Sequence, residues 1–229
     1  MFSSKYGPRQ KILILGISFG AAVFLSADPA RSQSQTFSDL AGREAQAQAI
    51  EDIGSKGIIA PQSPDKFNPS GVFTRGDFAV AAQKLFSLPK PKQEYYFADV
   101  PKESPLYAAV QAAAPFMDRR AICPTCLVSS NFAPNAPVSR AHAAISLARM
   151  EIANKKAALV DPREVNSALA GIPDVGELSP LARQLIATAI KSGAITPSSG
   201  QAFEPAANYD RGDIAVVLFN TEKLLNIRP

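Results

Sequence analysis

Two cysteines are the residues of this sequence whose spacing comes closest to enzymatic chemistry. Cys123 and Cys126 form a Cys-Pro-Thr-Cys motif. A pair at this spacing can be a thiol–disulfide redox centre, half of a metal site or a disulfide that closes a loop. Redox motifs of this kind begin a helix after a strand, and no strand pattern precedes this pair. We therefore predict a local disulfide in an oxidising compartment, with free thiols and a redox or metal role as the alternatives.

The remaining composition excludes several kinds of catalytic site. The 229 residues include one His, two Cys and no Trp. A zinc site at the cysteine pair needs two further ligands, and the single His142 cannot supply both. We predict no catalytic residue, no metal and no cofactor, so we expect the chain not to be an enzyme. A Cys-x-x-Cys oxidoreductase is the competing hypothesis, and an insulin-reduction assay without turnover would dismiss it.

The charge distribution argues against a nucleic-acid partner. The chain has 24 Lys and Arg against 20 Asp and Glu. The first 32 residues contain four of these cations and one acid, which leaves 20 basic against 19 acidic residues in the remainder. Nucleic-acid binding requires a basic face. We therefore expect no nucleic-acid partner.

Residues 1–32 have the pattern of an export signal. Three basic residues precede an apolar run over residues 12–25, and Ala30-Arg31-Ser32 follows as an Ala-x-Ser cleavage pattern. The run of 14 residues is shorter than the roughly 20 needed to span a bilayer. We expect cleavage, no membrane span afterwards, and a location in the periplasm, cell wall or cell envelope. An uncleaved anchor is the alternative.

Internal repeats are the strongest feature of the sequence. Four landmarks recur three times in order: an opening with Asp at its third position, an Ile-x-Pro, a Phe-x-Pro and an Arg. The openings begin at residues 37, 97 and 172, and the Phe-x-Pro triplets begin at Phe67, Phe132 and Phe203. The arginine follows eight residues after each Phe, at Arg75, Arg140 and Arg211. An identical interval in three copies indicates a repeated structural unit.

Each copy contains two stretches with helical periodicity. The first precedes the Ile-x-Pro, as in the spacing of Ile50 and Ile53, and the second follows the arginine, as in Phe78, Ala82 and Leu85. The residue before each arginine favours a helix N-cap. These residues are Thr74, Ser139 and Asp210. A helix should therefore begin at each arginine, and Asp77 and Asp213 add a carboxylate to the first turn.

One such unit cannot bury its own apolar stripes, so the three units must pack on one another. We predict an all-α fold of three helix–loop–helix repeats packed as one pseudo-threefold helical bundle, with the phenylalanines of the Phe-x-Pro triplets in the core between repeats. The expected boundaries are a signal peptide at 1–32, repeat 1 at 33–96, repeat 2 at 97–152, a connecting segment at 153–171 and repeat 3 at 172–229. The connecting segment should contain one or two further helical turns.

The ordered landmarks resemble the S-layer homology repeat, and three tandem copies is the usual number in that family. The resemblance covers residues 37–225. It implies a compact helical module with grooves between repeats, which hold a peptidoglycan-linked cell-wall polysaccharide noncovalently. In the family this polysaccharide often carries pyruvate ketals.

The resemblance also implies the ligand-binding residues. The family's motif arginine contributes to the groove, which carries over to Arg75, Arg140 and Arg211. A guanidinium fork matches a carboxylate, and a helix N-terminus favours an anion. We add the neighbouring motif positions to the candidate site. These are Thr74, Asp77, Ser139, His142, Asp210 and Asp213. Structural pairing is the alternative role of the arginines, and a cap or surface role is the alternative for His142.

The chain also departs from the family pattern. The family's early Trp is absent, and Gly76 and Gly212 stand where Ala is usual. Asp77, His142 and Asp213 stand where Glu is usual. These departures leave the sugar open and favour a second hypothesis, a protein-interaction module that keeps the scaffold without sugar binding. Another envelope protein is then the expected partner.

Overall fold

The computed structural model describes residues 36–117, 131–197 and 201–227. The predicted signal peptide and the predicted disulfide between Cys123 and Cys126 lie outside these ranges, so both stay predictions. None of the helices within the described ranges is long and apolar enough to cross a bilayer.

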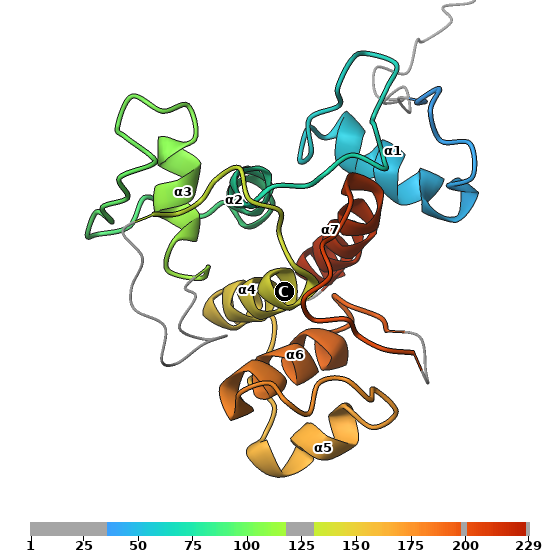
Figure 1. The fold of residues 1–229 in the computed structure, drawn as a ribbon, viewed down its shortest axis with the longest axis vertical. Coiled ribbons are helices and arrows are strands. Elements are labelled where there is room, and N and C mark those ends of the chain that lie inside the picture. Colours follow the sequence, from blue (N-terminus) through green and yellow to red (C-terminus); the bar gives the residue numbers. More distant parts are fainter. Residues whose placement is uncertain (1–35, 118–130, 198–200, 228–229) are drawn as a thin grey trace, which may run out of the picture. The chain divides into compact units, whose positions relative to one another are not determined.

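All regular elements of the described residues are helices, which confirms the all-α prediction for this part of the chain. Figure 1 shows their arrangement. The elements are the 3₁₀ turn η1 (Glu44–Gln46), α1 (Ala47–Ser55), α2 (Arg75–Phe86), α3 (Tyr107–Ala113), α4 (Arg140–Ala153), the 3₁₀ turn η3 (Pro162–Glu164), α5 (Val165–Ala168), α6 (Pro180–Ser192) and α7 (Arg211–Ile227).

Three helices begin at the residue that the sequence predicts. Arg75, Arg140 and Arg211 are the first residues of α2, α4 and α7. The segment predicted to connect the second and third copies contains η3 and α5, as expected. These starts follow from local sequence, because a capping side chain fixes the point at which a helix can begin.

The main helix pairs join successive copies and not the two helices of one copy. α2 packs on α3, α4 packs on α6, and α7 packs on α1 (Figure 1). α1 and α7 lie at opposite ends of the described sequence, so the last helix covers the first. Each copy thus buries the apolar stripe of its second helix against the first helix of the next copy.

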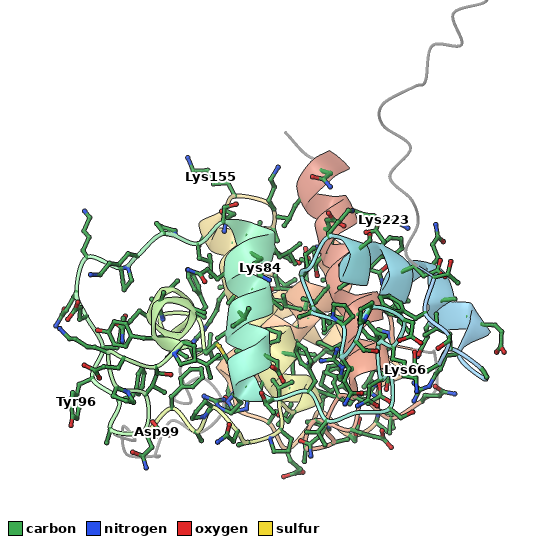
Figure 2. All side chains as sticks on the ribbon, turned by 90° about the horizontal axis from the view of Figure 1, so that it is seen from above. Lys66, Lys84, Tyr96, Asp99, Lys155 and Lys223 are labelled. Atoms are coloured by element: carbon green, nitrogen blue, oxygen red, sulfur yellow. The ribbon has the colours of Figure 1, made fainter. Side chains whose placement is uncertain are left out.

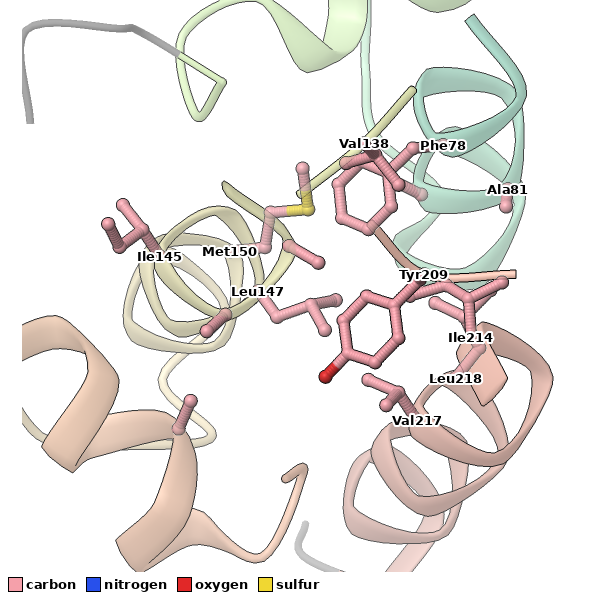
Figure 3. Packing of buried hydrophobic residues seen from close by; sticks show 14 of the residues in the cluster. Phe78, Ala81, Val138, Ile145, Leu147, Met150, Tyr209, Ile214, Val217 and Leu218 are labelled. Atoms are coloured by element: carbon pink, nitrogen blue, oxygen red, sulfur yellow. The ribbon is translucent and has the colours of Figure 1, made fainter. Parts of the chain in front are cut away.

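A shared apolar core lies between α2, α4 and α7 (Figure 3). Phe78 from α2, Leu147 and Met150 from α4, and Ile214 and Leu218 from α7 are each 0% exposed. Fully burying a side chain of this size contributes about 1.5–3 kcal/mol to folding. The three arginine-bearing helices are therefore held together mainly by their own apolar faces.

The loops before these helices also pair with one another. Isolated antiparallel bridges join Thr74 to Pro137, Ser139 to Asn208, and Asp210 to Val72. The backbone N–H of the first helical residue then donates to a loop carbonyl of the next copy in each case. These bonds are Arg75 to Ala136 at 2.8 Å, Arg140 to Ala207 at 2.8 Å and Arg211 to Gly71 at 3.0 Å. The contacts run from the first copy to the second, from the second to the third, and from the third to the first.

Candidate functional site

The aspartate of each opening fixes the Phe-x-Pro loop of its own copy. The Asp39 carboxylate accepts the backbone N–H groups of Phe67 and Asn68, at 3.0 and 2.7 Å. Asp99 and Asp174 make the same pair of bonds in the other copies, at 2.6–2.8 Å. Sequence analysis found these aspartates only as landmarks. Their constant position in each opening was the available signal.

The same loops hold a non-glycine residue in a left-handed conformation. The middle residues of the three Phe-x-Pro triplets, Asn68, Ala133 and Glu204, have φ angles of 58°, 57° and 54°. This conformation costs a residue with a side chain roughly 1–2 kcal/mol. The carboxylate bonds to the adjacent N–H groups offset that cost, so each loop presents its Phe in a fixed position.

Each arginine places its guanidinium over the Phe ring of the next copy. We call this contact, with the loop around it, the Arg75, Arg140 or Arg211 junction. The guanidinium carbon lies 4.8 Å from the Phe132 ring centroid at the first junction, 5.8 Å from Phe203 at the second and 4.9 Å from Phe67 at the third. The three rings are 0–3% exposed, so the predicted core role of these phenylalanines is confirmed. A cation held against a ring face is favourable by about 0.5–2 kcal/mol.

At the Arg75 junction, the guanidinium makes its polar contacts with other residues of the protein. Arg75 is 5% exposed, and its Nε donates to the Phe132 carbonyl at 2.9 Å. Its Nη1 lies 3.2 Å from Nε2 of His142. Because a guanidinium can only donate, His142 Nε2 must be the acceptor in this contact.

At the Arg211 junction, the guanidinium also donates to acceptors of the protein. Nε of Arg211 donates to the Phe67 carbonyl at 3.0 Å, and Nη2 donates to the Ala60 carbonyl at 2.7 Å. Burial lowers the pKa of Arg211 from its ordinary value, and the Asp77 and Asp39 carboxylates partly oppose this shift. Nε and Nη2 of Arg211 are thus bound to backbone carbonyls of the first copy.

Two residues of the first copy, Arg43 and Gln46, contact the aspartates next to Arg211. Arg43 lies 2.7 Å from the Asp210 carboxylate and 3.6 Å from Asp213, and Gln46 donates to Asp213 at 2.7 Å. Asp210 and Asp213, two of the three aspartates predicted for ligand binding, are therefore engaged by side chains of the chain itself. A methyl group added at Gly212 would come within 2.8 Å of the Gln46 side-chain oxygen, which gives a packing reason for glycine at that position.

The Arg140 junction differs from the other two. Nε of Arg140 is buried and has no hydrogen-bond partner among the described residues. Nη1 lies 3.8 Å from the Glu204 carboxylate, and the guanidinium carbon lies 5.3 Å from the Tyr209 ring centroid. The Arg140 side chain is 27% exposed and that of Glu204 is 61% exposed. This guanidinium is therefore held by aromatic faces and one loose ion pair.

The predicted capping residues do cap their helices. Thr74 and Asp77 form a reciprocal capping box, in which the Asp77 N–H donates to the Thr74 hydroxyl at 3.1 Å. The His142 N–H donates to the Ser139 hydroxyl at 3.2 Å, and the Asp213 N–H donates to the Asp210 carboxylate at 2.7 Å. The first N–H groups of these helices are engaged as well, by carbonyls of the next copy. An anion at a junction would therefore meet the guanidinium and not the helix N–H groups.

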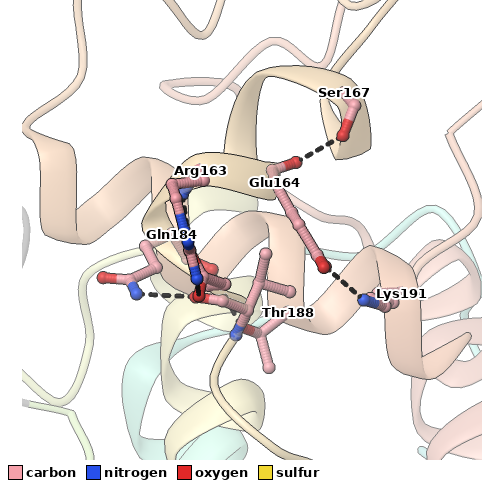
Figure 4. A network of polar contacts seen from close by, with 8 residues as sticks. Arg163, Glu164, Ser167, Gln184, Thr188 and Lys191 are labelled. Atoms are coloured by element: carbon pink, nitrogen blue, oxygen red, sulfur yellow. Dashed lines mark hydrogen bonds and ion pairs between the residues drawn. The ribbon is translucent and has the colours of Figure 1, made fainter.

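Two other surface features lie apart from the junctions. Polar contacts connect the η3–α5 segment to α6, including Glu164 to Lys191 at 2.7 Å and the Gln184 side-chain N–H to the Val160 carbonyl at 2.7 Å (Figure 4). They line two hollows of about 290 and 380 Å³. Tyr96, 83% exposed, projects from the loop before α3 (Figure 2). Neither feature contains a residue predicted for the site.

Two comparisons with known proteins found similarity to this chain. A family model described as the S-layer homology domain matches residues 36–79. That range contains the Asp39 contacts, Phe67 and Arg75, which are the structural landmarks of the first copy. An amylopullulanase of Thermoanaerobacterium thermosulfurigenes is 26% identical over 216 residues, a match that covers 92% of this chain and 11% of that protein. The S-layer homology match confirms the resemblance over residues 36–79, which belong to the first copy.

Proposed function

We propose that this protein binds peptidoglycan-linked polysaccharide of the cell wall through the surfaces between its three repeats. S-layer homology domains are cell-wall-binding modules and not catalytic domains. The observation that carries the finer proposal is the recurrence of one arginine at the start of α2, α4 and α7, each placed against the Phe-x-Pro loop of the next copy. An acidic sugar is the ligand that a guanidinium recognises best.

A pseudo-threefold arrangement of the repeats is part of this proposal. The loop bridges and the helix pairing between copies support it. In such an arrangement several weak sugar contacts on one polymer act together, because the first contact raises the effective concentration of the polymer at the others. The proposal also includes export, with removal of residues 1–32 and residence in the periplasm or cell wall.

Sedimentation with purified wall sacculi tests the proposal. We expect the mature chain, residues 33–229, to pellet with sacculi and to be released by the isolated wall polysaccharide. Bovine serum albumin serves as the control for nonspecific pelleting. A mature chain that stays in the supernatant at all protein concentrations would contradict wall binding.

A second function has one specific observation in its favour. The guanidinium groups of Arg75 and Arg211 donate to acceptors of the chain itself, so these two junctions are structural as well as candidate sites. This favours an envelope module that keeps the scaffold and binds another envelope protein. Absence of pelleting with every wall fraction, together with reproducible cross-linking to one envelope protein in intact cells, would support this function over sugar binding.

A further inference from the structure

We infer that only one of the three junctions binds the acidic group of the ligand, with Arg140 as its donor and Glu204 as an internal competitor for that donor. The inference rests on the proposed function and narrows it to one site. It predicts that three similar sequence motifs have two different roles.

The other two arginines already make hydrogen bonds within the protein. Arg75 donates from Nε to a backbone carbonyl and from Nη1 to His142, and it is 5% exposed. Arg211 donates from Nε and Nη2 to two backbone carbonyls. A ligand carboxylate would compete with bonds of 2.7–3.2 Å at either position. At Arg75 it would leave the acceptor of a buried hydrogen bond without its donor, whereas the hydrogen bonds of Arg211 to the Phe67 and Ala60 carbonyls are part-buried and exposed. Leaving a buried polar group unpaired opposes binding, so the Arg75 junction disfavours a ligand carboxylate most strongly.

Arg140 differs from the other two arginines. Its Nε is buried without a partner in the part of the chain that the structure describes, although the corresponding Nε atoms of Arg75 and Arg211 each donate to a Phe carbonyl. The guanidinium lies farther from its Phe ring than the other two do, and it shares a second ring, that of Tyr209. The aromatic faces support the cation without using its N–H groups. The fork therefore keeps donor capacity for a carboxylate.

The Glu204 carboxylate is the acidic group that faces Arg140 within the protein. Its carboxylate is 3.8 Å from Arg140 Nη1, too long for a strong charge-assisted hydrogen bond, which is about 2.7–2.9 Å. Its backbone N–H is held by Asp174 at 2.6 Å, while its side chain is 61% exposed. Glu204 can thus swing away without moving the loop. A ligand carboxylate would displace it and would be repelled by it while it stays nearby.

The ligand chemistry follows from this geometry. The Arg140 guanidinium lies against the Phe203 and Tyr209 rings on a side chain that is 27% exposed. A planar guanidinium fits a sugar that carries a carboxylate, whose two oxygens can accept in parallel from its N–H groups. A uronic acid and a ketal-linked acid share this chemistry. Mild acid hydrolysis removes ketals and spares uronic acids, so binding of wall polysaccharide before and after that treatment distinguishes the two sources.

The experiment measures the affinity of released wall polysaccharide for the full mature chain and five single variants by titration calorimetry, well below each melting temperature. We expect Arg140→Gln to weaken binding at least tenfold, which is about 1.4 kcal/mol. We expect Arg75→Gln and Arg211→Gln to lower the melting temperature, because each removes hydrogen bonds to the next copy, and to weaken binding less than Arg140→Gln does. Glu204→Gln should strengthen binding about threefold, a gain that misfolding cannot produce.

The outcomes separate this inference from the proposed function. Absence of wild-type binding contradicts the proposed function itself. Wild-type binding that Arg140→Gln leaves intact overturns the single-site inference and leaves wall binding standing. A tenfold loss in Arg75→Gln or Arg211→Gln with an unchanged melting temperature also overturns it. Arg140→Lys, which keeps the charge and loses the fork, should bind between the wild type and Arg140→Gln, and full wild-type affinity would contradict bidentate recognition.

Discussion

The aspartate of each opening fixes the backbone of the Phe-x-Pro loop in its own copy. Asp99 accepts two backbone N–H groups at 2.8 and 2.7 Å beside a left-handed residue, and its counterparts do the same. Sequence analysis predicted the arginine and cap positions because their chemistry is local. It did not assign the aspartates, because their partners lie 28–34 residues away along the chain. The engagement of Arg75 with His142 was likewise beyond the sequence, since it depends on which copies become neighbours.

Substitution of Asp99 by Asn tests its role. The amide retains one carbonyl oxygen and loses the charge, so at least one of the two charge-assisted bonds is lost. We expect the free energy of unfolding to fall by about 1.5–3 kcal/mol in urea titrations. Glu177→Gln, at an exposed position, is the matched control and should change it by less than about 0.5 kcal/mol. Equal stability of the two variants would contradict the structural role of Asp99.

Tyr209 gives a prediction for alkaline pH. Burial raises its pKa from 10.0 to about 12, with Arg140 partly opposing the shift. Because the unfolded chain releases the phenol proton first, the stability that Tyr209 contributes is complete below pH 10 and is lost as the pH rises towards 12. Relative to Tyr209→Phe, the free energy of unfolding of the wild type should fall by about 2–3 kcal/mol over this interval. Parallel pH profiles of the two proteins would show that the phenol is not buried in solution.

At the scale of elements, helix starts were predictable and helix partners were not. A cap and the first helical turn are neighbours in sequence, so the beginnings of α2, α4 and α7 were correct to the residue. The choice of α3 as the partner of α2 depends on long-range packing that periodicity does not encode. Leu181 illustrates the same limit. The four-residue spacing of Leu181 and Leu185 predicts one shared apolar face, yet Leu181 is 44% exposed and Leu185 on α6 is 3% exposed.

The capping box of α2 should be measurable by itself. Thr74→Ala removes the hydroxyl that accepts the Asp77 N–H and donates to its carboxylate. We expect a loss of about 1–2 kcal/mol in the free energy of unfolding, measured by chemical denaturation. Thr196→Ala, at an exposed position outside the helices, serves as the control. A loss no greater than that of the control would show that the box is not formed in solution.

At the scale of the whole molecule, the packing of α7 on α1 makes the three copies depend on one another. The Lys56–Glu222 ion pair at 2.8 Å lies between these helices, but a partly exposed pair contributes at most about 1 kcal/mol. The packing of α7 on α1 must therefore be stabilised mainly by apolar contacts. Sequence analysis predicted that the units pack together, although not that each pair of helices is shared between two copies.

Truncation of the mature chain after residue 152 tests this dependence. The deletion removes α6 and α7, which cover α4 and α1, so it exposes two apolar helix faces at once. We expect the two-copy chain to lose its cooperative urea transition, as followed by circular dichroism. Glu222→Gln in the full mature chain should retain that transition. A truncated chain with the wild-type midpoint would contradict the shared packing.

Equilibrium sedimentation of the mature chain with purified sacculi is the measurement that decides whether the surfaces between the repeats bind wall polysaccharide. If the protein binds the wall in this way, pelleting should be saturable, and it should be abolished by released wall polysaccharide but not by neutral dextran. Pelleting that neither saturates nor responds to the released polysaccharide would contradict this binding.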